Sequence, residues 1–383
     1  MKKADIAIVG GGLAGLTAAI HFVTYGLQVC LFEKETFPHH KVCGEYLSRE
    51  ILPYLESLNI RLSKLNPVEI NRLVYSTPQG KKIDVNLPLG GLGISRYALD
   101  NFLYLKAKEI GVEIINELVV DITFNQDKFS ITTQQGLETT FDFVLGAFGK
   151  RSLLDKKLNR DFIDKKSGWL AVKSHYGLDT YPENTVSLHN FKGGYCGLSK
   201  TETGAINVCY LATYKSFRDH KNSETYKNTV LCENPHLNSF FKQAKYLFEK
   251  ELTIAQVSFD KKSLVENHIL MLGDAAGLIH PLCGNGMAMA IHSAKLASES
   301  ILLYYKSSGY NRNTIEDSYR EQWNFHFKSR LKTGRFLQKI LLNPGLAEIS
   351  QSLIKAFPVV LPKIITKTHG MPILTRRKNI DNR

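Results

Sequence analysis

The sequence predicts an α/β fold: a Rossmann-like dinucleotide-binding domain that carries an inserted, mainly antiparallel β-sheet domain and C-terminal helices. Three observations predict it. The first 33 residues read as strand, glycine-rich turn, helix and strand, a strand–Gly–Asp–loop–helix segment recurs at 269–299, and strands of alternating polarity lie between them. A chain of 383 residues suits two closely joined domains.

The N-terminal segment has the order of a nucleotide-binding unit. Its parts are a buried strand (Asp5–Val9), a G-x-G-x-x-G turn (Gly10–Gly15), a helix (Leu16–Tyr25), a second strand (Leu27–Phe32) and Glu33. Gly10 permits the tight turn, Gly12 lets the backbone approach a pyrophosphate, and Gly15 lets the helix lie close to the sheet. The helix N-terminus attracts phosphate, and Glu33 can accept hydrogen bonds from ribose hydroxyls.

The segment at 269–299 predicts a flavin as the nucleotide ligand. A short strand (Ile269–Leu272) leads to Gly273 and Asp274, and a loop with Pro281 precedes a helix rich in small residues. An acid at a strand end can hold a hydroxyl of the ribityl chain. The N-terminus of the following helix would stabilise negative charge at the pyrimidine edge of a reduced flavin.

Four patterns together carry a resemblance to a known family. They are G-D-A-A-G-x-x-x-P-x-x-G-x-G-x-x-x-A at Gly273–Ala290, K-x-C-G at Lys41–Gly44, Ser95-Arg96 with Asp100 four residues on, and Val119-Val120 after a strand. On these, residues 1 to about 305 resemble the flavoproteins that contain the geranylgeranyl reductases and the p-hydroxybenzoate hydroxylase-like aromatic-ring hydroxylases. The resemblance implies FAD on a glutathione-reductase/p-hydroxybenzoate-hydroxylase type of domain, with NADPH or NADH as an electron donor.

The motifs and the resemblance together give a set of expected site residues. Expected FAD contacts are Gly10, Gly12, Leu13, Ala14, Gly15, Glu33, Lys34, Lys41, Cys43, Gly44, Arg96, Val120, Gly273, Asp274, Pro281, Gly284, Asn285, Gly286 and Met287. Cys43 and His280 are candidates for contact with flavin or substrate, although a small packed thiol and a structural imidazole are equally simple readings. Gly194 and Tyr195 are expected at the substrate.

Two segments depart from the family pattern. Phe148 stands where a G-A-D-G segment would place an acid, so the electron donor stays open. Residues 194–199 keep the tyrosine of the family's Y-x-W-x-F-P substrate segment and lose its other members, so a polyprenyl substrate also stays open.

The resemblance divides the chain into three parts. The FAD-binding domain is expected at 1–61, 91–168 and 258–310, the substrate-binding cap at 62–90 and 169–257, and a helical region with a basic tail at 311–383. Alternating apolar residues in Trp169–His175 and Ala205–Leu211 predict antiparallel strands in the cap.

Charge is concentrated near the C-terminus. Residues 324–383 hold 12 Lys or Arg and 2 Asp or Glu, which accounts for +10 of the net charge of +13. Trp323, Phe327 and Leu331 predict a helix there, whereas Pro358 and Pro362 interrupt the next apolar stretch. We expect either a solvated helical surface or a peripheral contact with a membrane, and no nucleic-acid module.

Cysteine usage and hydropathy indicate a cytoplasmic protein. The six cysteines are scattered without a C-x-x-C pair, which predicts reduced thiols and no metal site. His39 and His40 are expected as loop residues. No apolar stretch approaches the roughly 18 residues of a membrane span.

Three functions fit these observations. The first is a flavoenzyme that reduces C=C bonds of a polyprenyl or polyene. The second is a flavin-dependent monooxygenase that hydroxylates an aromatic or polyketide substrate. The third is a prenyl-protein escort factor without enzymatic activity, which would not need the intact glycines at 10, 12 and 15.

Overall fold

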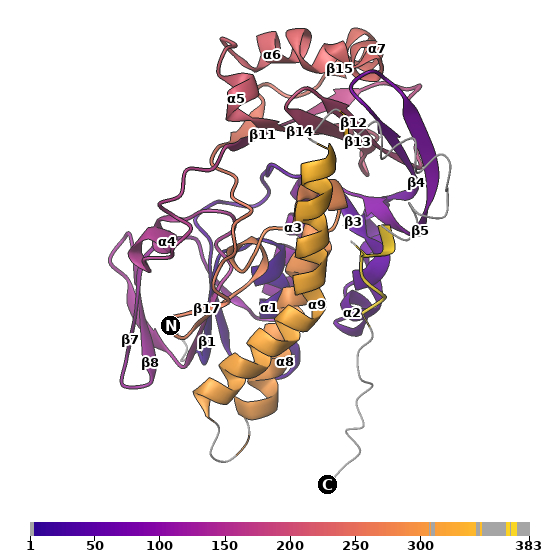
Figure 1. Ribbon diagram of the computed structural model, residues 1–383. Coiled ribbons are helices and arrows are strands. Elements are labelled where there is room, and N and C mark those ends of the chain that lie inside the picture. Colours follow the sequence, from indigo (N-terminus) through magenta and orange to yellow (C-terminus); the bar gives the residue numbers. More distant parts are fainter. Residues whose placement is uncertain are drawn as a thin grey trace.

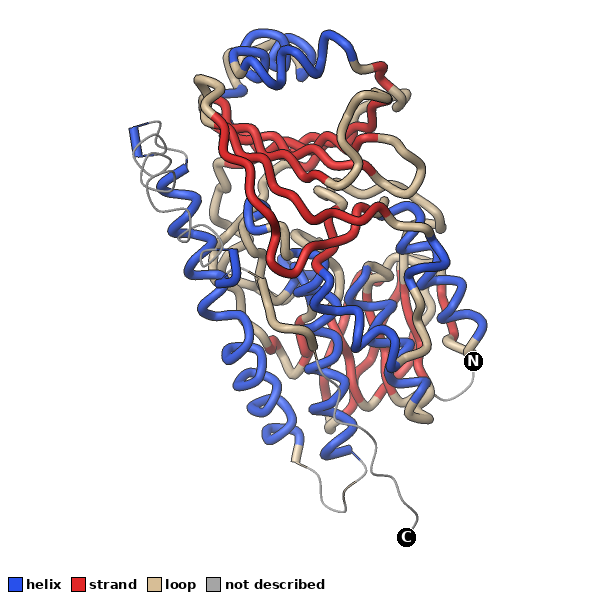
Figure 2. The backbone as a smooth tube through the Cα atoms, turned by 90° about the vertical axis from the view of Figure 1, so that its right-hand side faces the viewer, coloured by secondary structure: helices blue, strands red, loops and turns tan. Residues whose placement is uncertain are grey.

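The computed structural model describes residues 4–305, 307, 311–341, 345–346, 365–367 and 369–373. Within them, a mainly parallel sheet flanked by helices lies below a large, mainly antiparallel sheet, and a long helix runs beside both (Figures 1 and 2). The predicted α/β fold with an inserted antiparallel domain is confirmed. The expected tail and residues 354–364 lie outside the described residues.

The lower sheet has six strands, of which five are parallel. In spatial order they are β17 (Val265–Glu266), β18 (Ile269–Met271), β10 (Phe143–Gly146), β1 (Ile6–Val9), β2 (Val29–Phe32) and β6 (Glu113–Ile115). Every residue of β1, β2, β10 and β18 is buried, which explains why these strands are almost continuously apolar. Strands β1 and β10 end side by side, and their ends position the glycine turn.

Three helices lie beside this sheet, and one of them, α1, packs on β1 and β2. They are α1 (Leu13–Thr24), α3 (Arg96–Glu109) and α8 (Gly286–Tyr305), with α1 in contact with both others. Helix α1 begins three residues earlier than expected, because the chain turns into the helix directly after the extended Gly12. Gly15 therefore lies inside the first turn of α1.

A three-stranded antiparallel sheet completes the lower domain. It consists of β7 (Val119–Asn125), β8 (Lys128–Thr133) and β9 (Glu138–Phe141). The ring of Phe141 meets that of Phe32 edge-on at 6.1 Å, so this sheet shares the core of β2. The short helix α4 (Leu153–Lys157) contacts β7.

The upper sheet forms the cap. Its strands in spatial order are β15 (Lys245–Tyr246), β11 (Trp169–Gly177), β14 (Ile206–Thr213), β13 (Gly194–Lys200), β12 (Thr185–Phe191), β4 (Val68–Ser76), β5 (Lys82–Gly93) and β3 (Tyr46–Ser48), with β16 (Leu252–Ile254) also paired to β11. All pairs are antiparallel except β12 with β4. Strand β3 pairs with Gly91–Gly93 at the end of β5, and both lie within the ranges expected for the FAD-binding domain. Strand β5 begins in the range expected for the cap, so this sheet runs across the expected boundary at 90/91.

Three helices cover the outer face of the cap sheet (Figures 1 and 2). They are α5 (Tyr214–Phe217), α6 (Ser223–Thr229) and α7 (Pro235–Gln243). Tyr226, Leu231 and Leu237 are fully buried between these helices and the sheet. The opposite face of the sheet is thereby turned toward the lower domain.

The C-terminal helix α9 (Arg312–Leu341) runs along the lower domain toward the cap (Figure 1). Trp323, Phe327 and Leu331 are buried, as their four-residue spacing predicts, and Ile315 and Tyr319 continue the buried face toward the start of the helix. A Cβ on Gly334 would lie 3.1 Å from the Cys283 sulfur, and one on Gly277 would lie 3.1 Å from the Trp323 ring. Helix α9 therefore packs directly on the loop between β18 and α8.

The remaining helical elements are short. They are α2 (Leu52–Ser57) and 3-10 turns at Arg49–Ile51, Leu62–Leu65, Leu231–Glu233, Gly273–Ala275 and Pro281–Cys283. In the part of the chain that the structure describes, no helix combines the length and hydropathy needed to cross a membrane.

Candidate active site

A cavity of about 1410 Å³ lies between the two large sheets. The glycine turn, the loop after β18, the Lys41–Tyr46 segment, the inner face of the cap and the end of α9 all contribute to its walls. Most expected cofactor residues line it: Gly10, Gly12, Leu13, Ala14, Glu33, Lys34, Lys41, Cys43, Gly44, Arg96, Gly273, Asp274, Pro281, Gly284, Asn285, Gly286 and Met287. The fold thus brings together segments up to 277 residues apart in the chain, from Gly10 to Met287.

The glycine turn is shaped for a group that approaches the backbone. Gly10 has φ +111°, and a Cβ there would lie 2.4 Å from the Ala147 carbonyl oxygen. A Cβ on Gly15 would lie 1.9 Å from the Gly10 oxygen, so Gly15 supports the turn from behind and is not itself a lining residue. The Gly11 amide donates to Glu33 Oε2 at 2.7 Å, which holds the acid at the mouth of the turn. These features fit the pyrophosphate and ribose of a dinucleotide.

The loop after β18 begins beside the glycine turn and lines the same cavity. Gly273 has φ +54°, a conformation that residues with a side chain rarely adopt, and a Cβ there would lie 3.2 Å from the Cβ of Ala14, so this position favours glycine. Lys262 donates to the carbonyl oxygens of Asp274 and Lys150, both at 2.8 Å, and burial lowers the pKa of Lys262 to about 8. Helix α8 starts at Gly286, so its N-terminus opens on the cavity and favours negative charge there.

Arg96 reaches the glycine turn from the start of α3. Its Nη2 would lie 3.8 Å from a Cβ on Gly12, and its guanidinium makes two bonds of 2.6 and 2.7 Å to the Asp100 carboxylate. Lys41 Nζ lies 3.1 Å from the same carboxylate. Burial alone would raise the pKa of Asp100, but the charges of Arg96 and Lys41 outweigh it and hold that pKa below its usual value. An ionised Asp100 keeps two cations oriented beside the turn.

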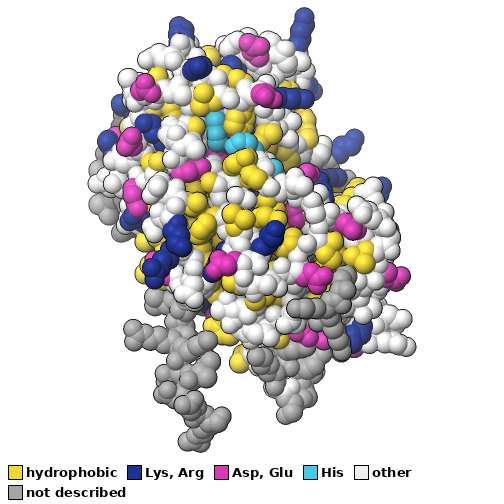
Figure 3. Space-filling view, turned by 180° about the vertical axis from the view of Figure 1, so that it is seen from behind, with side chains coloured by type: hydrophobic (Ala, Val, Ile, Leu, Met, Phe, Trp, Pro, Cys, Tyr) yellow, Lys and Arg dark blue, Asp and Glu magenta, His cyan; other side chains and the backbone are white. Residues whose placement is uncertain are grey.

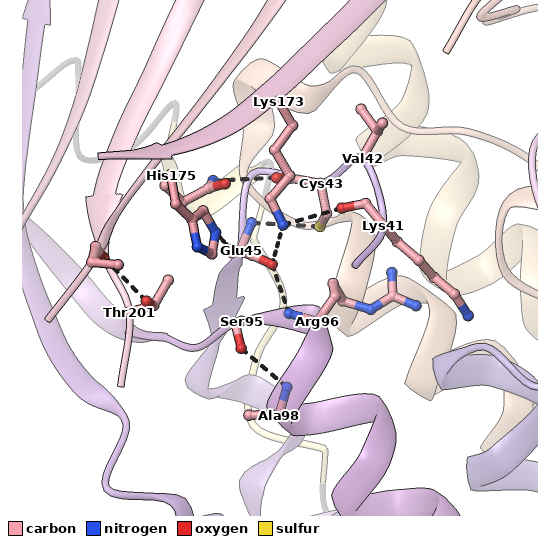
Figure 4. Close-up of polar contacts among 12 residues, drawn as sticks. Lys41, Val42, Cys43, Glu45, Ser95, Arg96, Ala98, Lys173, His175 and Thr201 are labelled. Atoms are coloured by element: carbon pink, nitrogen blue, oxygen red, sulfur yellow. Dashed lines mark hydrogen bonds and ion pairs between the residues drawn. The ribbon is translucent and has the colours of Figure 1, made fainter. Parts of the chain in front are cut away.

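A cluster that the sequence did not predict lies beside the Lys41–Glu45 segment (Figure 4). Glu45 and Lys173 are fully buried and form an ion pair, and His175 Nε2 lies 2.8 Å from Glu45 Oε2. Burial alone would raise the pKa of Glu45, but the hydrogen bond from His175 and the charge of Lys173 outweigh it and lower that pKa. Lys173 and His175 are two apart on β11, so strand periodicity placed them on one face, but no local signal tied them to Glu45.

This cluster also contains ligand-type atoms for a metal. Nitrogen atoms of His40 and His175 and an oxygen of Glu45 lie within 4.8 Å of one another. The Lys173 ammonium, bonded to the same carboxylate, opposes a further cation at this place. On the back face of the molecule, histidine side chains reach the surface among hydrophobic ones (Figure 3).

The two candidate reactive side chains lie in different environments. Cys43 is half-buried and lines the cavity, and its sulfur accepts the Glu45 amide at 3.5 Å. His280 is buried outside the lining residues, where its ring lies 4.7 Å from that of Phe259 and 5.8 Å from that of Tyr195. Burial lowers the pKa of His280 to about 3, so its imidazole is neutral at physiological pH.

Of three other expected residues, Tyr195 lines the cavity and Gly194 and Val120 do not. Tyr195 lines the cavity from β13, whereas Gly194 lies within the sheet, where a Cβ would be 2.1 Å from the Leu211 oxygen. Val119 at the start of β7 lines the cavity, whereas Val120 is half-buried outside the lining. Phe148 lines the cavity at the position where the resemblance would place an acid.

Comparison with known proteins agrees with this geometry. A family described as FAD binding domain matches residues 3–324. The chain is 24% identical over 364 residues to digeranylgeranylglycerophospholipid reductase 2 of Methanothermobacter thermautotrophicus, covering 92% of this chain and 91% of that protein. It is 22% identical to menaquinone reductase of Mycobacterium tuberculosis over 78% of this chain and 76% of that protein.

Among solved structures, the flavin-dependent brominase Bmp2 has the same fold. It superimposes with a TM-score of 0.78 at 18% identity, over 96% of this chain and 93% of that one. The family match, the relatives and the fold agree with the shaped dinucleotide site. The chain belongs to the FAD binding domain family and is an FAD-dependent oxidoreductase of the superfamily that includes geranylgeranyl reductases and aromatic halogenases.

Proposed function

We propose that this enzyme reduces C=C bonds of a long hydrophobic substrate, a polyprenyl or polyene, with NADPH or NADH as electron donor. The observation that carries the proposal is the size and lining of the cavity. At about 1410 Å³ it exceeds the roughly 300–1,000 Å³ of a single small-ligand site, so it accommodates FAD together with a second ligand.

The part of the cavity away from the nucleotide segments is apolar. Its walls come from β4, β5, β12, β14, the loop after β16 and α9, and they include Leu73, Ile83, Leu87, Val186, Leu188, Leu211, Val257, Phe336, Leu337 and Ile340. Such a surface stabilises a hydrocarbon by about 25 cal/mol for each Å² that is removed from water. It also keeps water away from the place where Cys43 and Tyr195 face the cofactor segments.

Each polar segment has a task that needs no acid or base from the protein. When bound and reduced, FAD would supply both hydrogen atoms that a saturated double bond gains, one as a hydride and one as a proton. The turn at Gly10 and Gly12 would bind the pyrophosphate, Glu33 the ribose, and Asp274 the ribityl chain. The N-terminus of α8 would stabilise charge on the pyrimidine ring. The apolar cap would orient the double bond over the flavin.

The two candidate reactions, reduction and oxygenation, have different support. The two reductases named above support reduction, and each matches over more than three quarters of the chain. The brominase shows the fold alone. Oxygenation of an aromatic or polyketide substrate, the monooxygenase-type alternative, is the second candidate because residues 194–199 lack most of the substrate segment of the reductase branch.

Anaerobic single turnover separates the two candidates. The purified protein, loaded with FAD and chemically reduced, is mixed without oxygen with a geranylgeranyl lipid. We expect the oxidised flavin absorbance to return and the product to gain two hydrogen atoms for each saturated bond. A flavin that stays reduced until oxygen is admitted, together with substrate-stimulated oxygen uptake and an oxygenated product, would establish the alternative.

Filling the apolar end of the cavity tests where the substrate lies. Leu188→Trp adds a large side chain to the cavity wall on β12, in the apolar cluster that contains Tyr195. We expect kcat/KM for a long polyprenyl substrate to fall at least about tenfold and the Kd for FAD to stay within about threefold, since overpacking acts locally. Leu247→Trp, at an exposed leucine of the cap, is the matched control. Unchanged turnover of the long substrate in Leu188→Trp would place the substrate elsewhere.

The mouth of the cavity at α9 suits a membrane-borne substrate. Phe336 lines the cavity and is 62% exposed, and Lys328, Lys332, Arg335 and Lys339 are exposed around it. We propose that this surface contacts anionic lipid. Replacing Lys328, Arg335 and Lys339 by glutamate should weaken binding to phosphatidylserine vesicles by at least about tenfold, because each cation contributes about 1 kcal/mol near such a surface.

Sedimentation with vesicles at low and moderate salt measures this. Reversal of Lys242, Lys245 and Lys250, which are exposed on the cap, gives the same change in net charge at another place. Equal loss of binding in both triple variants would show that only net charge matters and would remove the proposed contact surface.

A further inference from the structure

The Lys41–Glu45 segment is held by side chains from outside it, peptide by peptide. Three successive carbonyl oxygens each accept a side-chain hydrogen bond of 3.2 Å: that of Lys41 from Lys173, that of Val42 from Lys150, and that of Cys43 from Asn207. Lys173 is on β11 and Asn207 on β14, and these strands pair in the cap. The cap thus fixes the peptide planes of a segment that lines the cofactor cavity.

The end of the segment is fixed as well. Glu45 has φ +53°, a left-handed conformation that residues other than glycine seldom adopt. Its carboxylate accepts the Arg96 amide at 2.7 Å, the Lys173 ammonium and His175 Nε2 (Figure 4). A backbone in this region persists where the surrounding contacts determine it, and such residues gather at functional sites.

Lys173 joins these two sets of contacts. Its Nζ bonds both the first carbonyl of the segment and the carboxylate at its end, while the side chain is fully buried. Cys43 lies between those two points, half-buried, with its side chain at the cavity. The bonds at both ends and at the Cys43 carbonyl leave that thiol little freedom to change direction.

We propose that Lys173 and Asn207 are positioning residues of the active site, which hold the Lys41–Glu45 segment and direct Cys43 into the cavity. The cap thereby sets the geometry of the flavin-facing segment as well as the substrate wall. The inference concerns the same cavity as the proposed reductase activity, but the accessibility of Cys43 reports on it without any substrate.

The test separates positioning from stability. Lys173→Met alone leaves Glu45 buried without its cation, so it is expected to destabilise the fold. In Lys173→Met combined with Glu45→Gln the unpaired charge is gone, but the Lys41 carbonyl still lacks its donor. Asn207→Ala releases only the Cys43 carbonyl and changes no charge. Asn190→Ala, at a buried cap asparagine bonded to Tyr75, is the matched control.

The readout is the rate at which a thiol reagent labels Cys43, located by mass spectrometry, in the FAD-loaded protein. We expect the double variant to melt near the wild-type temperature yet to label about tenfold faster, and Asn207→Ala to label several-fold faster, as loss of one or two hydrogen bonds frees a segment. We also expect kcat to fall in both with KM within about twofold, and Asn190→Ala to match the wild type.

Wild-type labelling rates in both the double variant and Asn207→Ala would overturn the inference, whatever the stability of either protein. Absence of any turnover of polyprenyl lipids by the wild type would overturn the proposed reductase activity instead. In that case the labelling rates still decide the role of Lys173 and Asn207.

Discussion

Replacing Gly15 by alanine is expected to abolish measurable FAD binding and to lower the free energy of unfolding by about 1–3 kcal/mol. A Cβ at this position would lie 1.9 Å from the Gly10 carbonyl oxygen, 3.1 Å from its carbon and 3.3 Å from the Ala147 side chain. The first two are backbone atoms, which cannot rotate away as a flexible side chain could. Helix α1 must therefore move off β1, and the turn that would bind the pyrophosphate moves with it.

Fluorescence titration with FAD and urea unfolding measure both effects. Gly168→Ala is the control, because Gly168 is exposed and a Cβ there would have open space around it. This variant should bind FAD as the wild type does and change the stability by less than about 0.5 kcal/mol. If Gly15→Ala bound FAD within threefold of the wild type, the close approach of α1 to the turn would not be what shapes the site.

Replacing Arg160 by methionine is expected to lower the free energy of unfolding by about 3–5 kcal/mol, the effect of breaking a buried ion pair from one side. Arg160 is 2% exposed and bonds the fully buried Asp155 at 2.7 Å. Its Nη2 donates to the carbonyl oxygens of Ser263 and Ala275 at 2.8 and 2.9 Å. Methionine fills a similar volume but leaves the carboxylate and both carbonyls without this donor.

Urea unfolding of two further proteins makes the test specific. Arg218→Met removes an arginine that is 70% exposed beside Asp219, where an ion pair contributes about 0–1 kcal/mol. Arg160→Met combined with Asp155→Asn should recover part of the loss, because the uncompensated charge is gone. A loss below about 1 kcal/mol in Arg160→Met would show that water or a rearranged donor replaces the guanidinium.

The sequence predicted those parts of the molecule whose physical causes are local. The Asp5–Glu33 unit could be predicted because each glycine of the turn is required by steric constraints within a few residues, and because Glu33 directly follows its strand. The cap strands that begin at Trp169 and Ile206 could be predicted because apolar residues recur at every second position of a strand with one buried face. Most of the expected cofactor residues that line the cavity came from these local patterns together with the family resemblance.

The parts that escaped prediction depend on pairs far apart in the chain. Glu45 lies 128 residues before Lys173, and Arg160 lies 115 residues before Ala275. The sequence around Glu45 or around Arg160 therefore contains no signal that identifies these partners. His280 is next to Pro281 in the sequence, but its ring packs against that of Phe259 and does not line the cavity, whereas Pro281 does. Adjacent residues of one loop thus have different surroundings, and only the fold decides which faces the ligand.

The contact of α9 with the loop between β18 and α8 has a consequence for folding during translation. The glycine turn leaves the ribosome early, but Gly277 and Cys283 receive their cover, Trp323 and Gly334, only when the chain is more than 330 residues long. Domains form as they emerge, from the N-terminus onward. Strand β18 and helix α8 of the nucleotide-binding half follow the cap strands β11 to β16 in the chain, so this half is completed only after the cap has emerged. The nascent chain should therefore bind FAD and become yellow only near the end of translation, when α9 packs on the loop between β18 and α8.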